Sequence, residues 1–303
     1  MPIHSLSIPG DRPIFFRPMP KRLAHPNLKQ EWGKRVTVCI AAISCEGYIV
    51  TASDMMIACD LSSANVATVK LEQFHKEWIV MMAGDDITQA LPIIGKAETY
   101  FQKRANTLNV ARNCFKRAYQ NHLGELAADN VLGRFGLDME TFRKSGRRRF
   151  TESVFNSLCE EMRKVKAGCQ FLACGFDAGR RPHLFVVDEP GTDSVYDKPG
   201  FCAIGSGSYA ATGMLYYLEQ RIDRTVHETI FNVCAAKFMA EKVPGVGQQT
   251  HLHIQKQGCN AFVLKSWVIP TIKKEWQERG QPRMPDGLLE QLQRAHVAFL
   301  PRA

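Results

Sequence analysis

The sequence contains no hydrophobic run long enough to cross a membrane. A membrane-spanning helix needs about 20 mainly apolar residues, and polar or charged residues interrupt every apolar run of this 303-residue chain well below that length. The N-terminal stretch also lacks an uninterrupted apolar segment of signal-peptide length. We therefore expect a soluble, cytoplasmic protein with no membrane partner.

Cysteine and histidine spacings typical of metal sites are missing as well. The chain has ten cysteines but no Cys-x-x-Cys pair and no Cys/His cluster with zinc spacing. His251 and His253 alternate along a predicted strand and share a face, as two ligands could, but core or exposed histidines are the favoured interpretation. We expect no metal and no cofactor. Four cysteines lie within apolar segments and are expected to be buried and reduced: Cys39, Cys174, Cys202 and Cys234.

Basic residues are in excess, yet no nucleic-acid-binding motif accompanies them. Lys and Arg number 39 against 30 Asp and Glu, a net charge of +9, and clustered cations gain affinity for nucleic acids by releasing counterions. The clusters lie in the N-terminal tail, at residues 144–149 and at 273–274, without aromatic stacking motifs or a helix-turn-helix. We interpret them as solvated surface or as contacts to an acidic partner subunit, and we expect no nucleic-acid partner.

The chain divides by composition into three parts. Residues 1–36 are rich in proline and basic residues without a hydrophobic period, which predicts an irregular, disordered or propeptide-like arm. Residues 37–268 have the apolar content of one folded domain, and residues 269–303 are expected to form a C-terminal helical tail. No internal repeat is present.

Within the domain, short β-branched segments and helical patterns predict an α+β fold. Residues 133–168 are less regular, and we expect Asp138 to start a helix and residues 144–149 to make an exposed connection. The order of strands, helices, strands, helices and strands is that of two antiparallel sheets between two helical layers, although an unrelated α+β domain could share this composition. Strands are predicted at residues 36–43, 47–53, 68–74, 78–83, 169–176, 183–188, 194–197, 201–204, 250–256 and 259–265.

The most informative segment is residues 37–54. Two apolar runs flank a polar turn at residues 44–47, which predicts a β-hairpin with buried strands. Thr37 opens this hairpin and Asp54 closes it, so the two side chains are expected to meet at one end of a sheet. Lys70 and Gly84 then follow beside further apolar segments.

Threonine, aspartate, lysine and glycine in this order resemble the active-site set of proteasome β-type subunits, which are N-terminal nucleophile (Ntn) hydrolases. The resemblance extends over about residues 36–265 and includes Gly205-Ser206-Gly207-Ser208, which is similar to the family's turn into a helix. The sequence is also similar to bacterial proteasome-like proteins that begin Met-Thr-x-Cys-Ile-Ala-Ala. The resemblance implies a four-layer αββα sandwich and a homo-oligomer, with a ring as one form.

The resemblance further implies that Thr37 is a nucleophile. A threonine hydroxyl needs a base, and a threonine at the first position of a chain supplies its own α-amine, whose pKa near 8 suits neutral pH. Thr37 is internal here. We therefore expect either cleavage after Val36 or translation from Val36, read from a GTG codon as methionine that is later removed.

The other candidate residues take supporting roles by the same resemblance. Lys70 would favour ionisation of the Thr37 hydroxyl, with Asp54 as its counterion, and the Gly84 N–H would bind the oxyanion. By the same resemblance, Ser206 and Ser208 would orient the terminal amine. Glu241 would do so in place of an aspartate that the family has.

Structural alternatives remain at these positions. Thr37 could be an ordinary strand residue, Lys70 and Asp54 surface charges, and Ser208 a helix cap or part of a phosphate site. A one-residue slip in the hairpin would turn Ser53 towards the site instead of Asp54.

Two functions follow from this reading. The first is an N-terminal threonine amidohydrolase, a proteasome-like peptidase acting on a peptide or other amide substrate. The alternative is a non-catalytic proteasome-like subunit that acts in assembly.

Overall fold

The computed structural model describes residues 37–55, 57–59, 62–64, 70–84, 87–258, 262–264 and 267–280, with only the backbone described at 57–59, 62–64, 87 and 262–263. All of them belong to one compact unit within Lys34–Ala303. The predicted arm at residues 1–36 and the end of the predicted tail, residues 281–303, lie outside the described residues.

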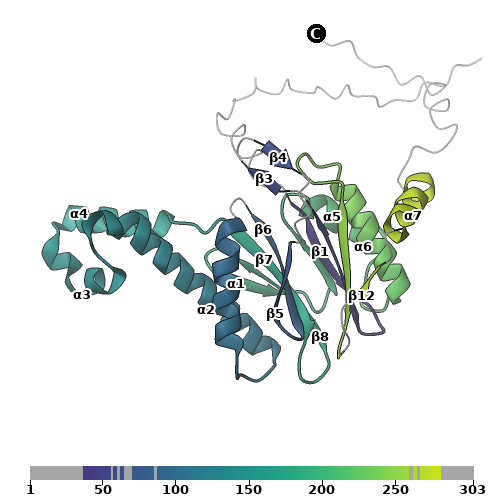
Figure 1. The fold of residues 1–303 in the computed structure, drawn as a ribbon, viewed down its shortest axis with the longest axis horizontal. Helices are drawn as coiled ribbons and strands as arrows, with labels where there is room; N and C mark the ends of the chain where they lie inside the picture. Colours follow the sequence, from purple (N-terminus) through teal and green to yellow (C-terminus); the bar gives the residue numbers. More distant parts are fainter. Residues whose placement is uncertain are drawn as a thin grey trace, which may run out of the picture. The chain divides into compact units, whose positions relative to one another are not determined.

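Two five-stranded antiparallel sheets lie at the centre of the fold (Figure 1). Each sheet combines strands from distant parts of the chain, and the two-stranded ribbon of β3 (Ile57–Cys59) and β4 (Ser62–Ala64) follows β2. The first sheet has the order β10 (Phe201–Ile204), β1 (Cys39–Ile43), β2 (Tyr48–Asp54), β11 (Thr250–Lys256), β12 (Phe262–Val263). The second has the order β5 (Leu71–His75), β6 (Trp78–Gly84), β7 (Cys169–Phe176), β8 (Pro182–Asp188), β9 (Thr192–Val195).

Helices cover the outer face of each sheet. A 3-10 turn, Ile87–Gln89, leads into α1 (Ala90–Phe101), and α1 and α2 (Leu108–Ala127) pack on the second sheet. On the first sheet lie α5 (Ser208–Tyr217) and α6 (Val226–Ala240), and α7 (Val268–Glu275), which ends in Trp276–Gly280, packs on α6. The predicted α+β sandwich of two sheets between helical layers is confirmed. No helix among the described residues has the length and apolar character to span a membrane.

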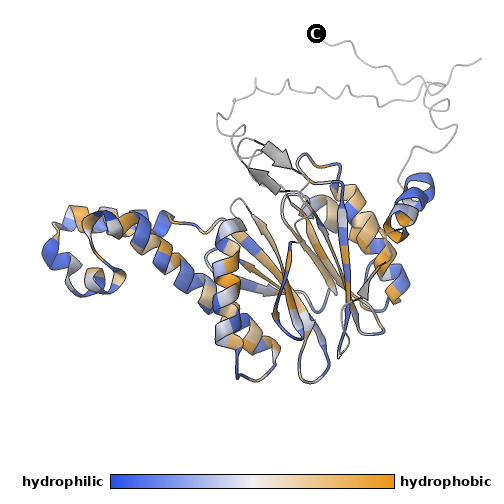
Figure 2. Ribbon diagram, viewed as in Figure 1, coloured by the Kyte–Doolittle hydropathy of each residue, from blue (hydrophilic) through white to orange (hydrophobic). Residues whose placement is uncertain are grey.

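The alternation of side chains between the two faces of each strand explains why the layers stack. Successive side chains of a strand point to opposite faces, and in β1, β6 and β7 nearly every residue is buried. Figure 2 colours these strands mainly as hydrophobic. In the first sheet, Val38, Ile40 and Ala42 pack under α5 and α6, whereas Cys39, Ala41 and Ile43 pack against the second sheet. The central strands are therefore buried on both faces, which explains why their residues are apolar at successive positions.

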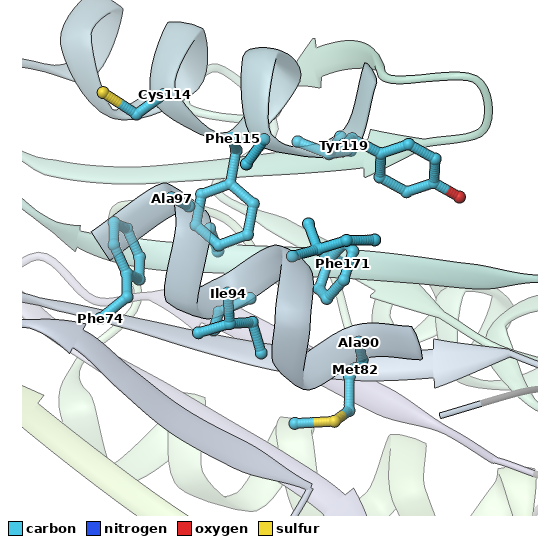
Figure 3. Packing of buried hydrophobic residues seen from close by; sticks show 14 of the residues in the cluster. Phe74, Met82, Ala90, Ile94, Ala97, Cys114, Phe115, Tyr119 and Phe171 are labelled. Atoms are coloured by element: carbon cyan, nitrogen blue, oxygen red, sulfur yellow. The ribbon is translucent and has the colours of Figure 1, made fainter. Parts of the chain in front are cut away.

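The layer under α1 and α2 is built around aromatic side chains (Figure 3). The ring of Phe115 lies edge-on to Phe74, with centroids 4.8 Å apart, and 5.6 Å from Phe171. Pro92 lies in the first turn of α1, where its missing N–H has no helical partner to lose. This aromatic layer connects α1 and α2 to the second sheet.

The less regular segment at residues 133–168 forms two further helices, α3 (Met139–Arg149) and α4 (Glu152–Lys164). They follow short helical turns at Ala128–Leu132 and Gly133–Phe135. Asp138 accepts the Thr141 N–H at 2.6 Å as an N-cap, so the predicted helix start is confirmed. The expected connection at residues 144–149 is wrong, because these residues continue α3 to its end. Basic residues at a helix C-terminus are favoured by the helix dipole, and the Phe142 ring stacks on Phe155 to anchor α3 on α4.

The predicted hairpin pairs in one unbroken register. Partners run from Cys39 with Ser53 to Ile43 with Ile49, and Gly47 closes the turn with φ +72°, a conformation that glycine adopts without strain. This is the geometry of a three-residue hairpin loop ending in a left-handed residue. The register places Asp54, rather than Ser53, against Lys70.

Candidate functional site

Three side chains from separate segments converge at one end of the two sheets. Thr37 precedes β1, Asp54 ends β2, and Lys70 precedes β5 in the other sheet. The Lys70 ammonium donates hydrogen bonds to Thr37 Oγ1 and, at 3.0 Å, to Asp54 Oδ1. All three residues are buried, none more than 3% exposed. A cation held this close to a hydroxyl favours its ionised form, and the aspartate supplies the counterion that a buried ammonium needs.

Backbone N–H groups fix the orientation of the aspartate. Val38 donates to Asp54 Oδ1 at 2.9 Å, and Gly247 donates to Asp54 Oδ2 at 3.3 Å. Both carboxylate oxygens are thus engaged, one of them by two donors. Hydrogen bonds to an ionised acceptor are among the stronger ones, so this carboxylate is held in one position beside Lys70.

The turn at residues 205–208 contacts the backbone of Thr37. Ser206 Oγ accepts the Thr37 N–H at 3.3 Å and donates to the Thr37 carbonyl at 3.3 Å, and the Gly207 N–H reaches the same carbonyl at 3.2 Å. Gly205 has φ +88°, and a Cβ there would lie 2.3 Å from the Thr37 carbonyl oxygen. Only glycine lets this turn approach so closely.

A pocket adjoins this group of residues. Gly84 ends β6 with φ +148°, and a Cβ on it would lie 2.1 Å from the Gly168 carbonyl oxygen. The pocket has a volume of about 280 Å³ and places Gly84 beside Gly205 and Ser208. The pocket is lined by Gly84, Lys166, Gly168, Cys169, Gln170, Asp188, Glu189, Gly205 and Ser208.

Two of the candidate residues have other surroundings than the sequence suggested. Ser208 is the first residue of α5, the N-cap position belongs to Gly207, and no side-chain cap forms, so the cap interpretation of Ser208 is wrong. Glu241 follows α6 and binds two lysines at 2.7 Å, Lys237 through Oε1 and Lys273 through Oε2. The structure therefore places Glu241 in an ion-pair cluster instead of against the Thr37 N–H.

Sequence reasoning missed the partners behind Asp54. Lys237 is fully buried in α6, and its ammonium donates to the Gly247 carbonyl at 2.6 Å. A single lysine within the apolar run of residues 233–240 was the available signal, because a buried ammonium needs partners. Lys273 also differs from the expected solvated charge, since it binds Glu241 and lies 5.4 Å from the Phe238 ring centroid.

The cysteines and histidines near the site belong to the core. Cys39, Cys174, Cys202 and Cys234 are buried and reduced, as predicted, and burial raises the pKa of the Cys39 thiol to about 12. Burial lowers the pKa of His253 to about 4, so this ring is neutral at physiological pH. No cluster of three or more potential metal ligands occurs within the described parts of the chain.

Comparison with known protein families finds a match to part of the chain. A model of the Proteasome subunit family matches residues 143–232, a segment that runs from α3 into α6 and contains the turn against Thr37. None of the curated proteins compared with the chain matches it. Taken with the two antiparallel sheets between helices, the family match supports a proteasome-like member of the Ntn hydrolase superfamily.

Proposed function

We propose that this protein is an N-terminal threonine amidohydrolase that cleaves peptides, with Thr37 as its nucleophile. The observation that carries the proposal is the position of Lys70, whose ammonium contacts both Thr37 Oγ1 and Asp54 Oδ1 in a buried site. A structural ion pair needs no hydroxyl partner. A lysine that stabilises a threonine alkoxide must contact the hydroxyl. The contact between Lys70 and Thr37 Oγ1 therefore supports the catalytic role.

The base in the proposed reaction is the α-amine of Thr37. This amine takes the Oγ1 proton as Oγ1 attacks the substrate carbonyl carbon, and the proton then passes to the leaving amine as the C–N bond breaks. A water molecule next attacks the resulting ester while the α-amine takes one of its protons, and Oγ1 leaves with that proton as the ester C–O bond breaks. The amine must be free for this, so the proposal requires that residues 1–36 be absent from the active protein.

The remaining groups position the reactants. Ser206, which accepts the Thr37 N–H at 3.3 Å, would orient the freed amine, and the Gly84 N–H would bind the oxyanion of the tetrahedral intermediate. The pocket beside Gly84 would hold the substrate, and Gly205, which lines it, lies against the Thr37 carbonyl. Ser208 lines that pocket and belongs to the substrate side of the site in this proposal.

The proposal includes the setting in which the enzyme works. Proteasome-family members assemble into rings, and we propose a homo-oligomer for this chain. We also propose a cytoplasmic location, which the buried free thiols of Cys39, Cys174, Cys202 and Cys234 support, because disulfides are rare in that compartment.

The test is covalent labelling of Thr37. A chain that begins Met-Thr at Thr37, with the methionine removed in the cell, should hydrolyse small peptide amides. It should also be labelled on Thr37, acylated by a β-lactone or alkylated by an epoxyketone. The full-length chain, with its amine locked in a peptide bond, should stay inert. Mass spectrometry of labelled peptides identifies the modified residue.

A label on any other residue, or equal turnover by the uncleaved full-length chain, would overturn the threonine mechanism. The non-catalytic subunit acting in assembly would then be the better reading. N-terminal sequencing of protein expressed from the native gene shows which form the cell makes.

A further inference from the structure

Among the described residues outside the Thr37 site, Lys237 is the most deeply buried cation. It lies on α6 with no exposed surface, donates to the Gly247 carbonyl at 2.6 Å and to Glu241 Oε1 at 2.7 Å. Burial lowers the pKa of Lys237, while the negative charges of Glu241 and Asp54 oppose that shift. Burying an ammonium is costly, and apolar side chains of similar size are often at least as stabilising as a buried ion pair. Stability alone is therefore a weak reason for a lysine here.

The loop that Lys237 holds touches the site from two sides. Gly247, whose carbonyl binds Lys237, donates its own N–H to Asp54 Oδ2 at 3.3 Å. The neighbouring Val246 is buried and closely packed on the turn that carries Ser206, since a Cβ on Gly207 would lie 2.9 Å from Val246 Cγ2. One loop thus contacts both the carboxylate partner of Lys70 and the turn beside the Thr37 N–H.

We propose that Lys237 is a positioning residue for the Thr37 site, acting through Gly247 on Asp54 and through Val246 on the Ser206 turn. This inference rests on the proposed function, and it assigns a role to a residue that touches neither Thr37 nor the pocket. Glu241 provides the countercharge that keeps Lys237 a donor. It acts on the site through Lys237, in place of the direct contact with the amine that the sequence suggested.

The contact between Lys237 and Gly247 should affect the reaction rate because it fixes the position of Asp54. A displacement of about 1 Å in a catalytic group can lower a rate by about a hundredfold. Without the Lys237 ammonium, the Gly247 carbonyl loses its charged donor. The backbone of Gly247, whose N–H binds Asp54, is then no longer held in place by Lys237. Asp54 and Lys70 can then move together away from Thr37 Oγ1.

Three variants, made in the chain that begins at Thr37, separate positioning from stability. Lys237→Met removes the donor and leaves Glu241 with Lys273. Lys237→Met/Glu241→Leu removes the whole buried pair, which restores an apolar fit and should bring the thermal unfolding midpoint back towards wild type. Lys273→Met is the matched control, because it removes one positive charge from the same carboxylate without touching Gly247.

The readouts are the maximal rate constant of Thr37 acylation by a β-lactone, the inhibition constant for its initial binding, and hydrogen exchange of the Gly247 amide. We expect Lys237→Met to lower the acylation rate constant by about tenfold to a hundredfold with initial binding little changed and with faster Gly247 exchange. The double variant should regain the unfolding midpoint but keep the low rate constant. Lys273→Met should stay within about twofold of wild type, as expected for a partly exposed pair.

Recovery of the wild-type rate constant in the double variant would overturn the positioning role, and so would an equal loss in Lys273→Met. The two proposals fail in different ways. A wild-type protein that is never acylated on Thr37 overturns the proposed function and this inference with it, whereas a reactive wild type with an equally reactive Lys237→Met variant overturns this inference alone.

Discussion

The ammonium nitrogen of Lys70 lies 3.0 Å from Asp54 Oδ1, and neither residue is more than 2% exposed. Asp54 ends a strand of the first sheet, whereas Lys70 leads into the second. The pair therefore joins the two sheets at the end where Thr37 begins β1. Replacing either partner affects both the sandwich and the proposed nucleophile.

Lys70→Met should destabilise the fold. It leaves the Asp54 carboxylate buried without its cation, and breaking a buried pair in this way costs about 3–5 kcal/mol. Lys144→Met is a suitable control, because the Lys144–Glu140 pair is exposed and should contribute about 0–1 kcal/mol. Urea denaturation measures both free energies of unfolding. Equal values for the two variants would show that the Lys70 pair does not stabilise the fold.

Gly84→Ala should disrupt the end of β6. An added Cβ would lie 2.1 Å from the Gly168 carbonyl oxygen, and φ is +148° at this position, so the backbone must move. Gly95→Ala is the matched control, since its Cβ would meet nothing within 4 Å in α1 and alanine in a helix is favoured over glycine by about 1 kcal/mol. Thermal unfolding should shift in opposite directions for the two variants. A Gly84→Ala variant as stable as wild type would contradict the close approach of Gly84 to Gly168.

The two Thr37 variants distinguish the hydroxyl from the rest of the side chain. In the chain that begins at residue 37, Thr37→Ala should abolish acylation and hydrolysis, because Oγ1 is lost. Thr37→Ser keeps the oxygen and loses only a methyl group, so part of the rate should remain. Initial rates with a peptide amide substrate, together with circular dichroism to check folding, provide the comparison. Residual turnover in Thr37→Ala equal to that of wild type would point to another nucleophile.

His183 should make stability depend on pH. Burial of its ring lowers the pKa, but Asp197, 2.7 Å from Nδ1, and Asp177, 3.3 Å from Nε2, outweigh burial, so that its pKa is raised above 6.5. A raised histidine pKa adds stability that is fully present below about pH 6.5 and lost as pH rises through the folded-state value. Wild type should therefore exceed His183→Gln in stability by more at pH 5.5 than at pH 8.5.

Urea denaturation at these two pH values tests the His183 prediction. Asp197→Asn should weaken the pH dependence, because it removes the nearer carboxylate. An advantage of wild type that is the same at both pH values, or larger at pH 8.5, would contradict the assigned direction.

The protein should form a homo-oligomer. Proteasome-family members assemble into rings, and both helical layers of this chain carry exposed large apolar side chains, among them Leu91 on α1 and Tyr209 and Tyr216 on α5. Size-exclusion chromatography with light scattering should give a mass that is a multiple of 34.1 kDa. A strict monomer across micromolar concentrations would contradict this prediction.

Local patterns predicted the strands of the two five-stranded sheets but missed the ribbon of β3 and β4. The strands at residues 169–176 and 250–256 coincide with β7 and β11, because alternating or continuous apolar runs between polar turns leave few other ways to bury their side chains. The N-cap at Asp138 was equally local. At residues 144–149 the same approach failed, since a charged run looks like a connection unless the helix it extends is known.

The sequence by itself determined the two-sheet sandwich and the hairpin that places Thr37 near Asp54, because strand alternation and turn residues are encoded within a few positions. Tertiary structure alone decided which distant groups complete the site. Lys70 and Ser206 reach Thr37 from separate segments, and Glu241 binds Lys237 and Lys273 instead. The partners of a buried charge depend on which loops pack beside it in the folded chain. A buried charge needs an opposite charge or a carbonyl nearby, and only the packed fold decides which group that is.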